Sequence, residues 1–159
     1  QKNQIGCLAQ HSLFNFSKIS IRIKTNEGFN CRVYKDLLGN QTIGYGHLIN
    51  SKDTFYINKK YSKTMLTRIF YSDLKGAISD FKRNYHYKIL PDYVQEVIIE
   101  MIFQLGIINV LEFKKFNYYI KKKQYYLAAL EMIKSRWYDQ TPKRANKLIA
   151  ILLQFDVRR

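Results

Sequence analysis

The chain has 159 residues, 47% of them apolar and 15% aromatic, and a formal net charge of +15. This is one domain's length, and the apolar content excludes a disordered chain. The charge predicts attraction to polyanions such as nucleic acid, anionic lipid or an acidic wall polymer, unless it is only a solubilising surface. No apolar run is long enough to span a membrane, and the first residues lack a signal-peptide core.

Residues 1–16 are interpreted as an N-terminal extension. They show no glycine–serine linker pattern, and Leu13, Phe14 and Phe16 are able to pack against the following domain. Because the chain starts at Gln1 rather than Met, the extension can also be the remnant of a larger or processed chain.

The two cysteines, Cys7 and Cys31, are expected to be free thiols, since one of them lies in the extension. No Cys/His cluster has metal-ligand spacing, so neither a metal nor a cofactor is predicted.

The first predicted helix runs from Ser17, a possible N-cap, to Glu27. Ile19, Ile23 and Glu27 recur every four residues and so share one face. Gly28 is typical of the residue that ends a helix, which makes Glu27 the last side chain on it.

Two strands follow, Cys31–Asp36 and Gln41–Ile49, rich in Val, Ile, Tyr and Thr and joined around Gly39-Asn40. Asp36 would end the first strand and Thr42 would begin the second. A hairpin folding back past a helix end can bring both side chains to one cleft with the last residue of that helix.

From Ser62 to about Asn84 the apolar spacing becomes helical, which predicts one long helix. Its apolar face consists of Met65, Leu66, Ile69, Phe70, Leu74, Ala77, Ile78 and Phe81.

A largely apolar helix begins at Pro91-Asp92 and stops at Gly106, and we expect it to be the buried central helix. Three more helices are predicted, Phe113–Ile120, Tyr125–Lys134 and Pro142–Leu153.

Glu27 and Asp36 lie nine positions apart, and Thr42 follows six positions after Asp36. Cleavage of a glycosidic bond needs two carboxyl groups, one to protonate the leaving oxygen and one to activate water or stabilise the cation. Two acids alone are a weak signal, because most acidic residues are solvated surface. Their setting between a helix end and a glycine-spaced run strengthens it.

Three separated blocks of the sequence form a recognisable pattern. They consist of Glu27-Gly28, Tyr34-Lys35-Asp36, Gly39, Thr42-Ile43-Gly44, Gly46-His47-Leu48, Phe103-Gln104-Leu105-Gly106, Ser135-Arg136-Trp137-Tyr138, Gln140-Thr141-Pro142 and Arg144-Ala145. In this order the blocks resemble the phage-type lysozymes, the muramidases that phages use to open bacterial cell walls. The resemblance covers about residue 17 to the C-terminus.

The resemblance implies an α+β, two-lobed lysozyme-like fold with a small β-sheet lobe and a larger helical lobe joined by a long helix. Residues 1–16 would precede a lysozyme domain at 17–159. Within it, the expected parts are the small lobe at about 28–61, the connecting helix at about 62–84, and the helical lobe at about 85–159 together with helix 17–27.

The resemblance assigns Glu27 as general acid, Asp36 as the base that aligns a water, and Thr42 as the hydroxyl that helps hold that water. It implies an inverting, single-displacement hydrolysis, which needs carboxyl groups roughly 6.5–9.5 Å apart. Without the motif, Glu27 would be read as part of a surface ion pair and Thr42 as an ordinary strand residue.

Arg144 matches the family's arginine that faces the catalytic glutamate. A nearby cation favours an ionised carboxylate and opposes an acid role, whereas desolvation by a bound glycan favours the protonated form. The sequence does not decide between these effects.

Phe103 and Gln104 match cleft-wall residues of the family, and Leu48 matches a backbone contact to substrate. Phe116 and Glu131 occupy two sugar-contacting positions at which the family usually has Ser and Asn. Binding of the substrate at these two positions is therefore expected to differ from the family pattern.

Gly46 and His47 are expected to support the site, with His47 paired to Asp73. Asp73 lies among the polar positions between Phe70 and Leu74, in a segment resembling the family's helix that carries the histidine's partner. The alternative is a solvated Asp73 and a histidine bonded only to backbone.

The leading hypothesis is a peptidoglycan hydrolase that cuts the β-1,4 bond between N-acetylmuramic acid and N-acetylglucosamine, as a free endolysin or a phage tail or baseplate module. The alternative is a catalytically silent wall-binding or structural module of the same fold. A third hypothesis, cationic binding to membrane or nucleic acid, predicts a steep loss of binding with salt.

The expected partner is cell-wall peptidoglycan, with no nucleic acid and no stable membrane insertion. The chain is expected to be a monomer unless it belongs to a larger tail protein. It would reside in the host cytoplasm before lysis and act on the periplasmic wall, or reside in the virion tail.

Overall fold

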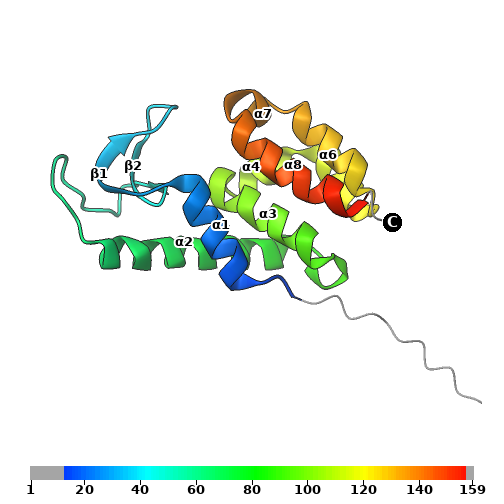
Figure 1. The fold of residues 1–159 in the computed structure, drawn as a ribbon, viewed down its shortest axis with the longest axis horizontal. Helices are drawn as coiled ribbons and strands as arrows, with labels where there is room; N and C mark the ends of the chain where they lie inside the picture. The colour runs from blue at the N-terminus through cyan, green and yellow to red at the C-terminus, as the bar shows by residue number, and fades with distance from the viewer. Residues whose placement is uncertain (1–12, 157–159) are drawn as a thin grey trace, which may run out of the picture.

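A three-stranded sheet lies at one end of the molecule and a group of helices at the other, with α2 running past both (Figure 1). The computed structural model describes residues 13–156. The elements are α1 (Phe16–Glu27), β1 (Asn30–Lys35), β2 (Gln41–Gly44), β3 (His47–Leu48), α2 (Lys63–Asn84), η1 (Tyr87–Ile89), α3 (Asp92–Leu105), α4 (Ile107–Glu112), α5 (Lys114–Lys121), α6 (Tyr125–Ile133), α7 (Arg136–Gln140) and α8 (Pro142–Asp156). The α+β class predicted from the sequence is confirmed.

The ends of α1 are set by two capping residues. The Asn15 side chain accepts a hydrogen bond from the Lys18 N–H at 3.0 Å, so the N-cap is Asn15, and the prediction of Ser17 was wrong. Asparagine is among the most favourable N-caps. At the other end, Gly28 has a φ of +70°, which glycine adopts without the steric cost of a Cβ. Glu27 is therefore the last helical residue, as predicted.

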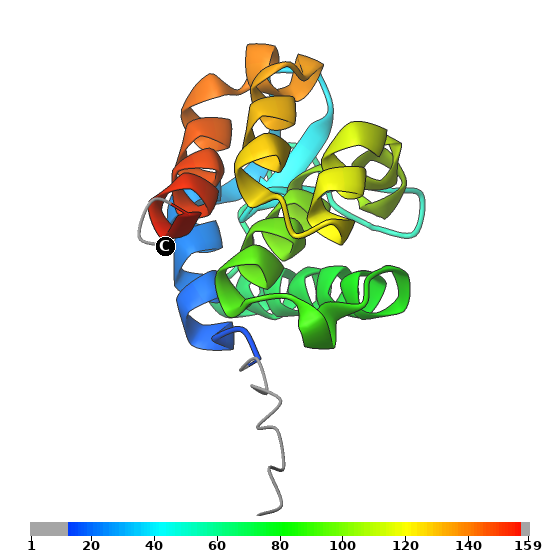
Figure 2. The same ribbon diagram turned by 90° about the vertical axis from the view of Figure 1, so that its right-hand side faces the viewer.

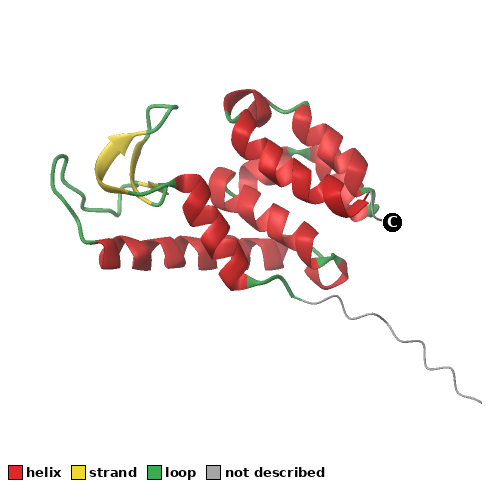
Figure 3. Cartoon of the chain, viewed as in Figure 1, coloured by secondary structure: helices red, strands yellow, loops and turns green. Residues whose placement is uncertain are grey.

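The sheet is antiparallel in the order β1-β2-β3 (Figure 3). Tyr34 pairs with Thr42 across β1 and β2, and Thr42 pairs with Leu48 across β2 and β3. The predicted single strand Gln41–Ile49 was wrong, because a turn at Tyr45-Gly46 divides it into β2 and β3. The positive φ of Gly46, +75°, permits this reversal.

Helix α2 contributes to two separate apolar clusters. It begins after Ser62, whose side chain accepts from the Met65 N–H at 3.2 Å. Leu66 packs into the small lobe, and Phe70 is the first residue of α2 to reach the core of the helical lobe. Met65 is 41% exposed, so it does not belong to the buried face predicted for this helix. The helix therefore connects the two lobes.

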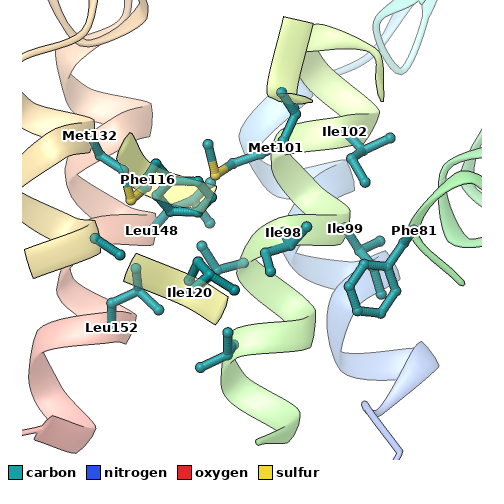
Figure 4. Close-up of a cluster of buried hydrophobic side chains, with 14 of the residues drawn as sticks. Phe81, Ile98, Ile99, Met101, Ile102, Phe116, Ile120, Met132, Leu148 and Leu152 are labelled. Carbon is teal, nitrogen blue, oxygen red and sulfur yellow. The ribbon is translucent and has the colours of Figure 1, made fainter. Parts of the chain in front are cut away.

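Helix α3 is the centre of the helical lobe, where it is buried from Tyr93 to Ile102 and ends at Gly106 as predicted. Apolar side chains from α5, α6 and α8 belong to the same core; Figure 4 shows Phe116, Met132 and Leu148 on the side of α3 that faces α6 and α8. The segment of α3 from Tyr93 to Ile102 is therefore covered by its neighbours on all sides.

The helical lobe contains short elements that the sequence did not predict: η1, α4 and α7. Each is too short for an apolar repeat to show in the sequence. The helices expected at Phe113–Ile120, Tyr125–Lys134 and Pro142–Leu153 are α5, α6 and α8, with slightly different ends. Helices α6, α7 and α8 lie together on one side of the lobe (Figure 2).

The small lobe has a cluster of its own, in which Ile43, Tyr61 and Leu66 are buried. The half-buried Cys31 packs against it as a free thiol. Cys7 lies outside the described residues. Within residues 13–156, no helix has both the length and the apolar character needed to cross a bilayer.

Candidate active site

Glu27 projects from the C-terminal end of α1 toward the turn between β2 and β3. A Cβ added to Gly46 would lie 2.7 Å from Glu27 Cδ, so the carboxyl group occupies the space that any other residue at position 46 would need. Both the backbone conformation and this close approach therefore require glycine at position 46.

Arg144, in the first turn of α8, forms an ion pair with Glu27, and each side chain is 14% exposed. The Arg144 Nε is buried and has no hydrogen-bond partner within the described residues. The resemblance implied that these two residues face each other, and the structure places them in contact. Arg144 thus joins the helical lobe to the carboxyl group at the border of the small lobe.

Asp36 lies immediately after β1 and accepts hydrogen bonds at both carboxylate oxygens. The Leu38 and Asn40 backbone N–H groups donate to Oδ1 at 2.9 and 2.8 Å, and Asn40 Nδ2 donates to Oδ2 at 3.2 Å. Desolvation acts to raise the pKa of Asp36, but the hydrogen bonds, led by those from Asn40, together hold it below its usual value. Asp36 is therefore ionised at neutral pH.

The pKa of the Tyr34 hydroxyl is affected by both carboxylates. Burial raises the pKa of its hydroxyl, and the negative charges of Glu27 and of Asp36 raise it further. Thr42 is directly opposite Tyr34 in the sheet, so their side chains are neighbours on one face. The hydroxyl of Tyr34 therefore feels the charges of both carboxylates, and its strand partner is Thr42.

Thr42 is 4% exposed, and its hydroxyl donates to the Asn40 carbonyl oxygen at 3.2 Å. The hydroxyl oxygen therefore remains able to accept a hydrogen bond from water. Sequence reasoning assigned no role to Tyr34 or Asn40. Tyr34 belongs to the motif Tyr34-Lys35-Asp36, whereas the signal for Asn40 was only its place four residues after Asp36.

A cavity of about 730 Å³ lies between Leu38, from the turn that follows Asp36, and side chains of the helical lobe. Phe116 and Glu131 both line it. Phe116 is only 1% exposed and belongs mainly to the core, whereas Glu131 pairs with Lys134 at 3.2 Å. The cavity walls consist of Leu38, Leu105, Asn109, Glu112, Phe113, Lys114, Lys115, Phe116, Glu131, Lys134, Ser135, Arg136, Trp137 and Gln140.

The other residues predicted to bind substrate do not line this cavity. Phe103 packs against Phe70, with ring centroids 5.5 Å apart. Gln104 Nε2 donates to Thr141 Oγ1 at 3.5 Å, and the buried Gln104 Oε1 has no hydrogen-bond partner in the part of the chain described. Leu48 is 56% exposed in β3. Their contacts with substrate remain predictions.

His47 bridges two carboxylates. Its Nδ1 lies 2.7 Å from Asp73 Oδ2 on α2, which is the contact predicted from the sequence, and its Nε2 lies 3.1 Å from Asp53 Oδ2. The hydrogen bond with Asp73 raises the pKa of His47 most strongly, burial opposes this, and Asp53 adds to the increase. The second partner, Asp53, was not predicted. His47 therefore attaches β3 to α2.

Residues 13–156 contain no group of three or more His, Cys, Asp and Glu side chains placed to hold a metal ion. The chemistry available at this site is that of two carboxyl groups in different environments, an arginine and a threonine hydroxyl. Glu27, Asp36 and Thr42 do not line the cavity described above, although Leu38 lies two residues after Asp36. Two carboxyl groups on neighbouring elements of an α+β protein are the groups that a glycoside hydrolase uses.

Comparison with known proteins gives the family. The model of the phage lysozyme family matches residues 24–152, and the chain belongs to that family. Probable T4-type lysozyme 2 of Dictyostelium discoideum is 32% identical over 158 residues, which cover 85% of this chain and 93% of that protein. Probable T4-type lysozyme 1 of the same organism is 31% identical, covering 86% and 94%.

The pre-baseplate central spike protein Gp5 of Enterobacteria phage T4 is 29% identical over 155 residues, which cover 82% of this chain but 27% of that protein. The resemblance inferred from the motifs is thus confirmed, and the chain is an enzyme of the lysozyme type.

Proposed function

We propose that this protein hydrolyses the β-1,4 bond between N-acetylmuramic acid and N-acetylglucosamine in peptidoglycan, with Glu27 as general acid and Asp36 as the base that acts through water. The observation that supports the proposal is the position of the two carboxyl groups. Glu27 ends α1 against the turn between β2 and β3, and Asp36 directly follows β1, which pairs with the strand that carries Thr42. Family membership supports the substrate class. The net charge of +15 supports attraction to an anionic envelope.

The environments of the two carboxyl groups fit different roles. Asp36 is held ionised by hydrogen bonds from Leu38 and Asn40, so it can take a proton from a water that attacks the anomeric carbon. The Thr42 hydroxyl, fixed by its bond to the Asn40 carbonyl, accepts a hydrogen bond from that water and aligns it. A water so placed attacks the face of the sugar opposite the leaving group.

Glu27 supplies the proton to the leaving oxygen. In the free protein its carboxyl group is paired with Arg144. Arg144 then remains beside the carboxylate that forms when the proton is given up, and stabilises it.

The test of the acid role is Glu27→Gln. The amide preserves the shape but has no acidic proton, so clearing of purified peptidoglycan should fall by at least about 10²-fold while the melting temperature stays close to wild type. Asp80→Asn, which removes a carboxylate paired with Arg83 on α2, is the matched control and should retain full activity. Retention of more than about a tenth of wild-type activity by Glu27→Gln contradicts the assignment.

The base role of Asp36 predicts the stereochemistry. Because water attacks directly, the first product released should have the inverted anomeric configuration, which proton NMR of early reaction samples measures. A retained configuration would exclude water activation by Asp36. A catalytically silent wall-binding module, the alternative function, predicts no released sugar at all.

For the biological setting, we propose bacterial wall lysis, either by a free lysin acting on the wall from the host cytoplasm or by a lysozyme module of a phage tail. Similarity to part of a baseplate spike protein supports the second setting, and similarity to free-standing lysozyme-length relatives supports the first. The reading frame of the full-length protein distinguishes them.

A further inference from the structure

Two glutamates of α3, Glu96 and Glu100, are buried although the proposed reaction does not use them. Glu96 is 2% exposed and Glu100 is 0% exposed, within a helix whose buried side chains are otherwise mostly apolar. Burial of a carboxylate costs free energy unless the group is paired and hydrogen-bonded. The partners of these two residues therefore indicate what they do.

Arg22 on α1 pairs with both carboxylates: its Nε donates to Glu100 Oε2 at 2.6 Å and its Nη1 to Glu96 Oε2 at 3.0 Å. The second oxygen of Glu100 accepts from Asn26 Nδ2 at 2.8 Å. Arg22 and Asn26 are four residues apart on α1, and Glu96 and Glu100 are four residues apart on α3. Successive turns of the two helices therefore face each other. We call Arg22, Asn26, Glu96 and Glu100 the α1–α3 network.

The α1–α3 network continues to α8 beside the catalytic carboxyl group. Asn26 Oδ1 accepts from Lys147 Nζ at 2.7 Å. Glu27 is the next residue after Asn26, and Arg144, its ion-pair partner, lies one turn before Lys147. Helices α1 and α8 are thus joined by two adjacent contacts, and one of them is the contact of the general acid.

The last turn of α1 depends on these polar contacts for its orientation. The buried residues of α1 are Ile19, Ser20 and Ile23, and none lies in the turn that carries Glu27. Apolar packing is non-directional, whereas hydrogen bonds require specific distances and angles. Two side chains of that turn besides Glu27 make such contacts: Asn26 bonds to Glu100 and Lys147, and Lys24 donates to the Tyr71 hydroxyl at 3.0 Å. Asn26 is the one that is adjacent to Glu27 and that bonds to both α3 and α8.

We propose that Asn26, held by Glu100 and Arg22, is the positioning residue for the general acid, a role that rests on the proposed function of Glu27. A buried ion pair by itself is weak evidence for stability, since apolar residues of similar volume often replace one without loss. The α1–α3 network fixes the direction of the Glu27 side chain relative to Arg144 and the cleft.

The decisive experiment exchanges donor and acceptor between Asn26 and Glu100. Asn26→Asp alone places a carboxylate against that of Glu100, and Glu100→Gln alone leaves an amide facing an amide. The double variant Asn26→Asp/Glu100→Gln restores the pair with its direction reversed and the net charge unchanged. The introduced amide can still accept from Arg22, and the introduced carboxylate can still accept from Lys147.

Each variant is measured with soluble peptidoglycan fragments, at a temperature at which melting curves show it fully folded. For Asn26→Asp we expect kcat to fall by about tenfold or more with KM within about twofold of wild type, because small misplacement of a reacting group costs rate rather than binding. The double variant should recover kcat to within about threefold of wild type. Lys18→Met is the matched control, since Lys18 lies 3.8 Å from Glu96 on the same face of α1 but is 62% exposed and two turns from Glu27.

A wild-type kcat in Asn26→Asp, or a double variant that regains its melting temperature but not its kcat, overturns the proposal. If a single variant does not fold, Arg22→Met/Glu96→Met/Glu100→Met replaces it, because removal of all three charges leaves none buried alone. A stable triple variant with wild-type kcat would then assign the α1–α3 network to folding only. Glu27→Gln is assayed in parallel. If Glu27→Gln stays active, the proposed function fails. If Glu27→Gln is inactive but the variants of the α1–α3 network are fully active, only this inference is overturned.

Discussion

The two lobes are stabilised in different ways. In the helical lobe, buried apolar side chains from α1, α2, α3, α5, α6 and α8 form one continuous core. In the small lobe the buried apolar cluster consists of Ile43, Tyr61 and Leu66, and much of the order comes from hydrogen bonds within turns, such as those to Asp36 and Asp53. The helical lobe therefore supplies most of the folding free energy.

The chemistry lies mainly on the weaker lobe and at its border. Asp36 and Thr42 belong to the hairpin, and Glu27 ends the helix that leads into it, whereas Arg144 comes from the helical lobe. Polar groups in surface turns are free to face water or substrate. In a packed core each polar group needs a hydrogen-bond partner from the protein itself. Substitutions in the two lobes should consequently affect stability and activity in different proportions.

The largest expected effect on stability is in the helical lobe. Leu148→Ala removes a fully buried side chain at the contact of α8 with α3 (Figure 4) and should lower the free energy of unfolding by about 2–5 kcal/mol. Denaturant unfolding measures this value. Leu111→Ala, at a position 42% exposed in the same lobe, should cost much less. Equal losses would mean that the core is not where the structure places it.

The next prediction concerns activity in the small lobe. Gly46→Ala brings a methyl group against the Glu27 carboxyl group and strains a backbone with φ +75°, so activity should fall by about 10²-fold. Gly76→Ala on α2 is the matched control, because its Cβ would meet no atom within 4 Å. It should keep activity and gain up to about 1 kcal/mol of stability, since alanine favours helix. Turbidity clearing and thermal melting test both variants.

The smallest expected effect concerns the link between the lobes. His47 has a raised pKa, so its contribution to stability is complete below about pH 6.5 and is lost as the pH rises through the folded value. The pKa of Asp53 is lowered by hydrogen bonds from Asn50 and His47 that outweigh desolvation, so its contribution exists above about pH 3.9 and is lost as the pH falls through the folded value. The stabilisation should be greatest between these limits.

A double-mutant cycle of His47→Asn and Asp73→Asn at pH 5 to 6 measures this link. Coupled residues in contact give an interaction free energy of about 0.5–3 kcal/mol, and the value should decrease at pH 8 to 9 as His47 loses its proton. A second cycle with Asp53→Asn separates the two carboxylates. Simple additivity at pH 5 to 6 would show that neither contact contributes.

The sequence determined the elements with strong local signals. Gly28 ends α1 after Glu27 because glycine favours positive φ, and the apolar repeat from Leu66 to Phe81 gives α2 nearly to the residue. The motif also identified Arg144 as a partner for Glu27, although the two are 117 positions apart, because a family resemblance carries information on long-range contacts that local propensity does not. The short helices α4 and α7 were missed because their few residues show no repeat.

Only the tertiary structure decided which polar residues act together. Asp53 and Asn40 carry no sequence signal that separates them from surface residues, yet Asp53 contacts His47 and Asn40 donates to Asp36. Tyr34 belongs to the motif around Asp36, but the motif gave it no role. Glu96 and Glu100 even stand against the pattern of α3, and their burial makes sense only because α1 places Arg22 opposite them. Sequence periodicity reports which face of a helix is apolar, but a charged side chain can be buried only where another element brings its partner, and that meeting depends on the whole fold.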